Sequence, residues 1–275
     1  MTYSEKGSPP AGLGKLEREK YSALLRGTKV TLSVTEAARI LGLPKKKATM
    51  FLSLLAKKGW LKRIYQGIYI PVPPEFESSN IVAEEPFVIA EKIFSPCYIG
   101  GMNAANYWDL TEQIFLTVTV MTQKPVRKHQ QEIAGTKFLL HTLKPKYFFG
   151  LKKIWFNDVK VNMSDPSRTI IDMMLFPQFC GGTRFIVDVL VCYFKSKHRD
   201  VELLMSYLKQ GNNGAAIKRM GFLIEKYIPE QTELINFCAN HMTKGYSKLN
   251  PSLENSKLIT KWNLWVPENW KDSKT

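Results

Sequence analysis

The segment Lys45 to Lys58 combines residue types that can read the major groove of DNA. At ~100° per residue, it forms a helix with one apolar side. The opposite side mixes cations, hydroxyls and one flexible apolar side chain: Lys46, Met50, Ser53 and Lys57, flanked by Lys45, Lys47 and Thr49. Cations bind phosphates or guanine edges, hydroxyls bond to donor or acceptor edges, and an apolar side chain can contact a thymine methyl group. The pattern is typical of a recognition helix, although lysines on a solvated helix face can also serve solubility alone.

Other residues could bind a metal ion or act as a nucleophile only if the fold brought them close together. Asp158, Val159 and Lys160 form an acid-x-Lys element, which in metal-dependent nucleases holds a cation and helps to activate water. An exposed β-turn explains these three residues more simply. The histidines and cysteines are scattered without zinc-ligand spacing, at His129, His141, His198 and His241 and at Cys97, Cys180, Cys192 and Cys238. We therefore expect no catalytic residue, no cofactor and no metal site, and we expect reduced, mostly buried thiols.

Asp165, Arg168 and Asp172 share one face of a predicted helix through their i+3 and i+4 spacings. A helix cap plus an intrahelical ion pair explains them. The alternative is that Arg168 joins Lys160 in a basic patch for a partner. Three further basic groups are expected to be solvated, with a second DNA or RNA surface as the alternative: Lys152-Lys153, Lys195-Lys197-Arg199 and Lys218-Arg219.

The start and end of the helix before the basic segment are predicted by residues close to each other in the sequence. Ser33 and Glu36 stand in the S-x-x-E relation of a capping box, which predicts a helix start near Val34. Gly42 follows the last apolar residue of that short helix, in the position where a left-handed residue commonly ends a helix. Pro44 suits the first turn of the next helix. The sequence therefore predicts a helix-turn-helix.

A short β-ribbon is predicted after the second helix. Trp60 to Ile64 and Ile68 to Val72 are rich in β-branched and aromatic residues and are joined around Gln66-Gly67. Helix-turn-helix and ribbon together predict a winged helix-turn-helix, with a first helix at Lys15 to Arg26 and a short strand at Thr28 to Leu32. We expect these residues to contact DNA: Thr35, Lys45, Lys46, Lys47, Thr49, Met50, Ser53, Lys57, Lys62, Arg63 and Gln66.

The charge of the chain agrees with an anionic partner. The 275 residues carry a formal charge of +15, with a pI near 9.6. Between Thr28 and Val72, nine Lys or Arg stand against the single acid Glu36, a local excess of eight positive charges. The first residues lack an apolar segment of the signal-peptide type, and the longest apolar run, Phe185 to Phe194, is too short to span a bilayer. We expect a cytoplasmic protein without a membrane partner.

The order of the predicted elements indicates an α+β chain, a winged helix-turn-helix followed by a mixed sheet-and-helix domain. We expect a disordered leader at 1–14, the DNA-binding domain at 15–76, and an α+β C-terminal domain at 81–275 after the proline-rich, polar break. Ile114 to Thr122 alternates like a strand, Asp165-Pro166 marks a helix start, and four more helices are expected between Arg184 and Met242. The tryptophans of the tail, Leu258 to Trp270, are expected to pack onto the sheet.

Five further segments carry a resemblance to a known family. The winged helix is followed by YIGGMNAANYWDLTEQIFLTVTVMT, TKFLLHTL, YFFG, VNMSDPSRTIIDMM and IKRMGFLIEKY, in this order. From about Val30 to Tyr227 the chain resembles the AbiEi antitoxins of abortive-infection toxin-antitoxin systems. The resemblance implies a non-enzymatic repressor whose winged helix binds inverted repeats in double-stranded DNA upstream of its own operon. It also implies a C-terminal domain that counteracts a cognate nucleotidyltransferase-like toxin, with or without direct contact.

Two other functions remain open from the sequence. One is a winged-helix transcriptional regulator whose C-terminal domain senses a small molecule in an apolar pocket. The other is a DNA-processing enzyme that uses Asp158 and Lys160 with a metal ion.

Overall fold

The computed structural model describes residues 12–27, 31–72, 86–156, 159–268 and 270. The chain divides into two compact units. The first spans 1–97, 116–142 and 153–161, and the second spans 98–115, 143–152 and 162–275.

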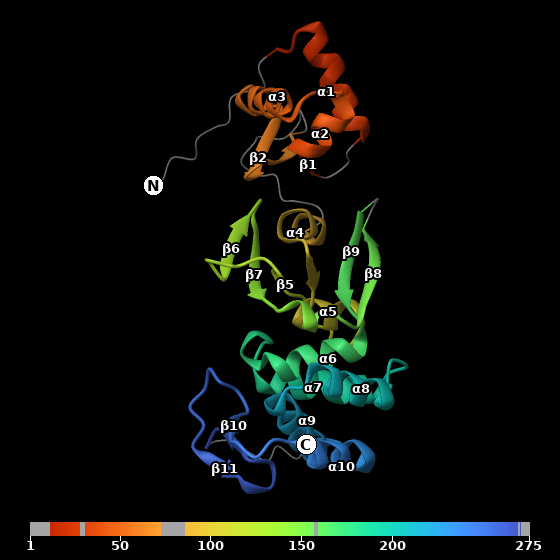
Figure 1. Ribbon diagram of the computed structural model, residues 1–275, viewed down its shortest axis with the longest axis vertical. Coiled ribbons are helices and arrows are strands. Elements are labelled where there is room, and N and C mark those ends of the chain that lie inside the picture. Colours follow the sequence, from red (N-terminus) through yellow and green to blue (C-terminus); the bar gives the residue numbers. More distant parts are fainter. Residues whose placement is uncertain (1–11, 28–30, 73–85, 157–158, 269, 271–275) are drawn as a thin grey trace. The chain divides into compact units, whose positions relative to one another are not determined.

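The N-terminal part of the first unit is a winged helix-turn-helix, as predicted (Figure 1). Its elements in chain order are α1 (Lys15–Gly27), β1 (Leu32–Ser33), α2 (Val34–Leu41), α3 (Lys45–Lys57), β2 (Leu61–Tyr65) and β3 (Ile68–Pro71). The three strands form an antiparallel sheet in the order β1-β3-β2. Residues 28–30 of the strand predicted at Thr28 to Leu32 lie outside the described residues, and the strand itself is Leu32–Ser33.

The predicted signals around α2 all take their expected form. The Ser33 hydroxyl accepts a hydrogen bond from the Glu36 amide at 3.2 Å, and the Glu36 carboxylate accepts one from the Ser33 amide at 2.9 Å. Gly42 ends the helix with φ 61°, a left-handed conformation in which a side chain would be strained. The helix is therefore fixed at both ends by its own sequence.

A six-stranded sheet follows, in the order β6-β7-β5-β4-β9-β8. Its elements and accompanying helices are α4 (Pro86–Phe94), β4 (Cys97–Ile99), α5 (Gly101–Tyr107), β5 (Thr117–Thr122), β6 (Gln130–Ile133), β7 (Thr136–Thr142), η1 (Pro145–Tyr147), β8 (Leu151–Phe156) and β9 (Val159–Ser164). β5 pairs with β7 in parallel, β4 pairs with β9 in parallel, and β6 pairs with β7 antiparallel. No strand is predicted at β6, because its QQEI sequence lacks apolar alternation.

The strand predicted at Ile114 to Thr122 starts three residues late. Pairing with β7 begins at Thr117, opposite Lys137, because β7 itself begins at Thr136. Without a neighbouring strand the preceding residues stay out of the sheet, and Ile114 and Leu116 are 85% and 88% exposed. The alternating pattern therefore begins before the first residue that has a partner on β7.

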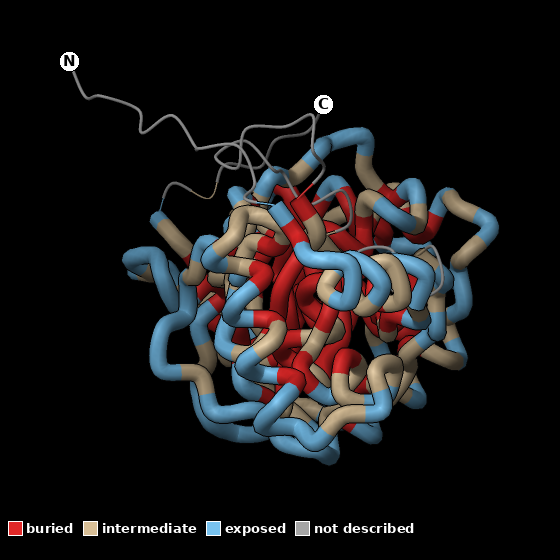
Figure 2. Tube along the Cα trace, turned by 90° about the horizontal axis from the view of Figure 1, so that it is seen from above, coloured by how far each residue is buried: buried red, intermediate tan, exposed pale blue. Residues whose placement is uncertain are grey.

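The second unit is mainly helical, as predicted. Its elements after β9 are α6 (Pro166–Leu175), η2 (Pro177–Phe179), α7 (Thr183–Lys195), α8 (Val201–Gly211), α9 (Gly214–Tyr227), α10 (Thr232–His241), β10 (Ser247–Lys248), β11 (Lys257–Ile259), η3 (Thr260–Trp262) and β12 (Leu264–Val266). Most described helices of the chain bury one side, so buried and exposed stretches follow one another along the trace (Figure 2). Every residue of α6 is buried, because α5, α7, α8 and α9 all contact it.

Two predictions about this unit are wrong. Lys218 and Arg219 are not solvated, since they are 1% and 6% exposed and donate to backbone carbonyl groups. In the described part of the tail, Trp262 and Trp270 pack on α9 instead of on a sheet. Trp262 is fully buried against α9, where its indole N–H donates to Glu225 at 2.7 Å, and β11 and β12 form a separate sheet with β10, in the order β10-β12-β11.

The Trp262 site depends on a helical glycine. A Cβ atom at Gly221 would lie 2.1 Å from Cζ3 of the Trp262 ring. We predict that Gly221→Ala lowers the free energy of unfolding by roughly 1–3 kcal/mol, because the buried indole has to move. Gly211→Ala is the matched control, since its Cβ would meet no atom closer than 3.9 Å. Urea unfolding checks both variants, and equal effects of the two would contradict the assigned clash.

Candidate nucleic-acid interface

The orientation of α3 is set by its buried residues. Ala48, Leu52 and Leu55 are 0% exposed and pack in the core of the winged helix with Leu24 and Ala37. Burial of each leucine side chain contributes about 1.5–3 kcal/mol, so rotating the helix about its axis would be costly. The opposite side of α3 is therefore held toward solvent.

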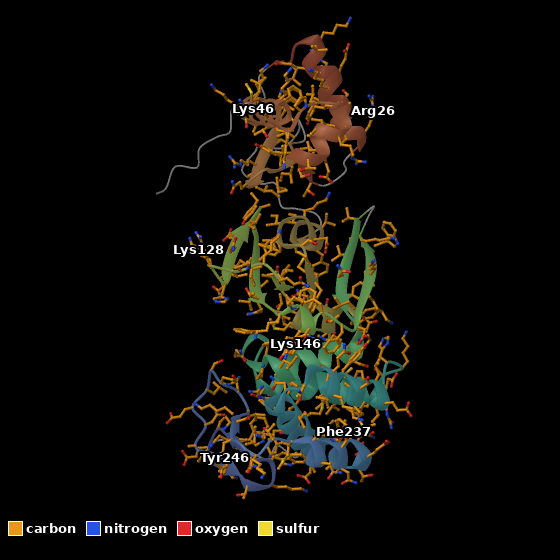
Figure 3. All side chains as sticks on the ribbon, in the orientation of Figure 1. Arg26, Lys46, Lys128, Lys146, Phe237 and Tyr246 are labelled. Atoms are coloured by element: carbon orange, nitrogen blue, oxygen red, sulfur yellow. The ribbon has the colours of Figure 1, made fainter. Side chains whose placement is uncertain are left out.

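The predicted DNA-contacting residues of α3 all lie on its exposed part. Met50 is 66% exposed. The remaining members are also exposed: Lys45, Lys46, Lys47, Thr49, Ser53 and Lys57. Lys46 is labelled on α3 in Figure 3. These residues form one continuous polar and cationic surface, which we call the α3 face.

The two hydroxyls of the α3 face already have partners within the domain. The Thr49 hydroxyl donates to the Lys45 carbonyl at 2.9 Å. The Ser53 hydroxyl lies 3.4 Å from the phenol oxygen of Tyr69 on β3. Both oxygens keep acceptor capacity, so they suit donor groups on base edges.

Three more of the predicted DNA-contacting residues lie on the wing. Arg63 on β2 is exposed, and its Nε donates to the Tyr65 carbonyl at 3.3 Å. Lys62 is half-buried. Gln66 is exposed at the turn, beside Gly67 with φ 74°. Thr35, the remaining predicted contact, is exposed in the first turn of α2.

Two acids of the winged helix, Glu36 and Glu17, form ion pairs within the structure. Lys92 of α4 forms an ion pair with Glu36. Burial raises the pKa of the Glu36 carboxyl, but hydrogen bonds from Lys92 and Ser33 outweigh burial and hold the pKa below its ordinary value. Lys58 forms an ion pair with Glu17 at 2.6 Å, and this hydrogen bond lowers the pKa of Glu17. Lys58 is thus engaged within the domain, whereas the lysines of the α3 face point to solvent.

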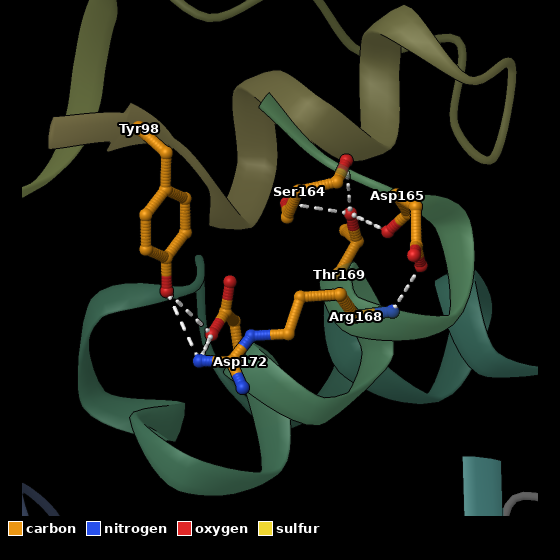
Figure 4. Close-up of polar contacts among 6 residues, drawn as sticks. All are labelled: Tyr98, Ser164, Asp165, Arg168, Thr169 and Asp172. Atoms are coloured by element: carbon orange, nitrogen blue, oxygen red, sulfur yellow. Dashed lines mark hydrogen bonds and ion pairs between the residues drawn. The ribbon is translucent and has the colours of Figure 1, made fainter. Parts of the chain in front are cut away.

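A second group of charged residues is buried in the other unit (Figure 4). Arg168 forms an ion pair with Asp172 at 2.8 Å, and both are 0% exposed. Tyr98 donates to Asp172 at 3.0 Å and accepts from Arg168 at 3.1 Å. Asp165 caps α6 by accepting from the Arg168 amide at 2.7 Å. The predicted cap and ion pair are confirmed.

The alternative use of Arg168 in a surface patch is wrong. Its guanidinium lies 4.1 Å from the ring centroid of Phe149 and is closed off from solvent. Burial raises the pKa of the Asp172 carboxyl even though Arg168 opposes the shift. A fully buried cluster has no access for a substrate, so its role is to orient α6.

Among the described residues, the candidate catalytic and metal-binding side chains do not form a common site. Asp158 lies outside these residues, and Lys160 lies over the Trp155 ring at 4.6 Å. Within the described ranges, no group of three or more His, Cys, Asp or Glu could hold a metal ion. The cysteines are free thiols, as predicted, and Cys192 alone is not buried. Burial raises the pKa of the Cys238 thiol to about 12.

No helix in the described part of the chain is long and apolar enough to cross a membrane.

The winged-helix segment is similar to a known protein family. Residues 19–72 match a family model described as "Transcriptional regulator, AbiEi antitoxin". The match runs from within α1 to the end of the wing, and over this segment it confirms the predicted resemblance. The resemblance predicted for the remaining residues to Tyr227 stays a prediction. No curated protein matches the chain.

The Glu36 contacts give a pH-dependent prediction. We expect Glu36→Gln to lower the free energy of unfolding by about 1 kcal/mol at pH 7, because the capping box and the Lys92 ion pair lose their charge. The folded-state pKa of Glu36 is lowered, so its contribution is present above the unfolded carboxyl pKa of ~4.3 and is lost as pH falls through the folded pKa.

Urea unfolding at pH 7 and at about pH 3 compares the two proteins on either side of this transition. The difference between them should shrink at the lower pH. Glu19→Gln, at an exposed position on α1, is the control. A difference that stays constant with pH would contradict the assignment.

Proposed function

We propose, from the match of residues 19–72 to the AbiEi antitoxin regulators, that this protein is a sequence-specific DNA-binding antitoxin that represses its own operon. The exposed α3 face supports the proposal, since it carries cations, hydroxyls and an exposed methionine on a helix whose other side is buried. Such a helix, followed by a basic wing, fits the major groove and the adjacent backbone.

The proposed contacts divide by chemistry. Lys46, Thr49, Met50 and Ser53 approach base edges, since they occupy the centre of the α3 face. Other cations hold phosphates: Lys45, Lys47, Lys57, Lys62 and Arg63. Gln66 at the wing tip enters the minor groove, and Thr35 at the start of α2 meets the backbone.

The proposed operator is an inverted repeat upstream of the operon. Two copies of the winged helix on such a repeat would follow the twofold symmetry of the DNA, with half-sites about one helical turn or a multiple of it apart. Each copy contributes a local excess of positive charge, so binding should be strongly salt-dependent.

Residues 81–275 are proposed as the antitoxin domain, which counteracts a nucleotidyltransferase-like toxin. The support is the resemblance to the AbiEi antitoxins of an ordered set of segments, from YIGGMNAANYWDL to IKRMGFLIEKY. We assign no catalytic role to this domain. The site of action is proposed to be the cytoplasm, where the operator DNA and the toxin would both be present.

Replacing Lys45, Lys46 and Lys47 together with alanine tests the DNA contacts. Each lost phosphate contact lowers the slope of log K against log salt by about 0.9. We expect a decrease of roughly one to three in that slope and weaker binding to the upstream DNA. Gel-shift titrations over a salt series measure both quantities.

A matched control removes three exposed lysines from the second unit: Lys209, Lys244 and Lys257. This variant loses the same charge but leaves the α3 face intact, so its salt slope should stay close to that of the wild type. An unchanged slope in the Lys45–Lys47 variant would refute the proposed contacts.

The antitoxin activity should be separable from DNA binding. If a neighbouring nucleotidyltransferase-like reading frame arrests growth when it is expressed, the Lys45–Lys47 alanine variant should still restore growth at the wild-type level of induction. The same variant should fail to repress a reporter driven by the upstream DNA. Loss of both activities in a protein that remains folded would contradict the division of roles.

A further inference from the structure

A second basic and aromatic surface lies on β8 and β9, which are different elements from the α3 face. β8 is the last strand in the order of the six-stranded sheet, and β9 is its neighbour (Figure 1). Lys153 and Trp155 belong to β8 and Lys160 belongs to β9. These three residues, all within the first unit, form what we call the Trp155 patch.

The geometry of β8 turns the Trp155 patch toward solvent. Alternate residues of a strand point to opposite faces, so Lys153 and Trp155 share one face and Ile154 and Phe156 share the other. Phe156 packs edge-on against Phe87 of α4, with ring centroids 5.2 Å apart. This contact fixes which face of β8 is turned inward.

The exposed face combines an aromatic ring with cations. Trp155 is 61% exposed, and the Lys160 ammonium lies 4.6 Å from its ring centroid. Lys153 and Lys160 are themselves exposed. A single exposed aromatic side chain is ordinary on a protein surface. A ring that lies against the Lys160 ammonium, with Lys153 on the same face of β8, is more specific, because it matches a planar base next to phosphates.

We propose that the Trp155 patch binds single-stranded nucleic acid. The indole stacks on one unpaired base, and Lys153 and Lys160 contact the flanking phosphates. A duplex keeps its bases stacked on one another and offers no base face to the indole, so the ligand is a single strand, of RNA or of DNA. This activity goes beyond the proposed operator binding and does not depend on it.

The same residues argue against a protein partner. Lysines on an edge strand oppose the addition of a strand from another chain. Lysine is also depleted at protein–protein interfaces, whereas single-strand sites combine lysines with aromatic rings. The patch therefore fits a polyanion with exposed bases better than it fits a polypeptide.

The test titrates the full-length protein with fluorescein-labelled oligouridylate and oligothymidylate of about 12 nucleotides and follows anisotropy. Trp155→Ala should weaken binding about tenfold, since removal of one stacked base contact typically has this effect. Trp155→Phe keeps a ring and should retain most of the affinity. The two oligonucleotides show whether the site prefers RNA or DNA.

The phosphate contacts have a separate readout. Lys153→Ala should lower the salt slope of single-strand binding by about 0.7, the value for one lost contact. Lys137→Ala on β7 is the matched control, since Lys137 is also an exposed strand lysine but pairs across the ladder with Glu132. Its slope should not change.

Two outcomes would overturn the proposal. The first is that the wild-type protein binds neither oligonucleotide. The second is that Trp155→Ala binds them as tightly as the wild type, including the case in which it weakens binding of the upstream duplex or of a co-expressed toxin instead. Weakened single-strand binding by Trp155→Ala, with unchanged binding of the duplex, supports the proposal. If the wild-type protein does not bind the operator, single-strand binding can still be measured.

Discussion

Burial of Ala48, Leu52 and Leu55 is the constraint on which the proposed DNA recognition depends. These residues decide which side of α3 faces solvent, because turning the helix would expose leucine side chains worth about 1.5–3 kcal/mol each. The lysines opposite them contribute little to folding, since exposed charges rarely do. Apolar packing therefore sets the position of the cationic side chains, and the cations remain available for phosphates.

The chain uses its positive charges in two different ways. Arg168 and Arg219 are buried and engaged, the first with Asp172 and the second with the Met174 carbonyl at 2.7 Å. Such groups do not add to a binding surface, although they count toward the formal charge of +15. The α3 face and the Trp155 patch carry exposed cations instead. Net charge thus indicates an anionic partner, whereas burial decides which side chains can meet it.

The buried cluster around Arg168 contains an ion pair inside the second unit. Oδ2 of Asp172 and two guanidinium nitrogens have no hydrogen-bond partner among the described residues, so the pair is not fully compensated. A buried ion pair of this kind is weak evidence for added stability. Its directional contacts with Tyr98 instead select one orientation of α6, the helix that contacts four neighbouring helices.

The sequence by itself determined the features that depend on neighbouring residues along the chain. The capping box at Ser33, the left-handed Gly42, the amphipathic α3 and the start of α6 after Asp165 all follow from local hydrogen bonds and helical periodicity. The exposed positions of the predicted DNA contacts on α3 follow from the same periodicity. Their contacts with DNA remain predictions.

Only the tertiary structure decided the features that need a distant partner. Trp262 packs on α9 because Gly221 leaves room for its indole, β5 begins where β7 begins, and Lys218 is buried by the loop that carries Gly245. No local pattern carries this information, since the free energy of each choice comes from residues far apart in the sequence. Trp155 and Lys160 belong to the same class, because a ring and a cation on different strands meet only after the strands pair.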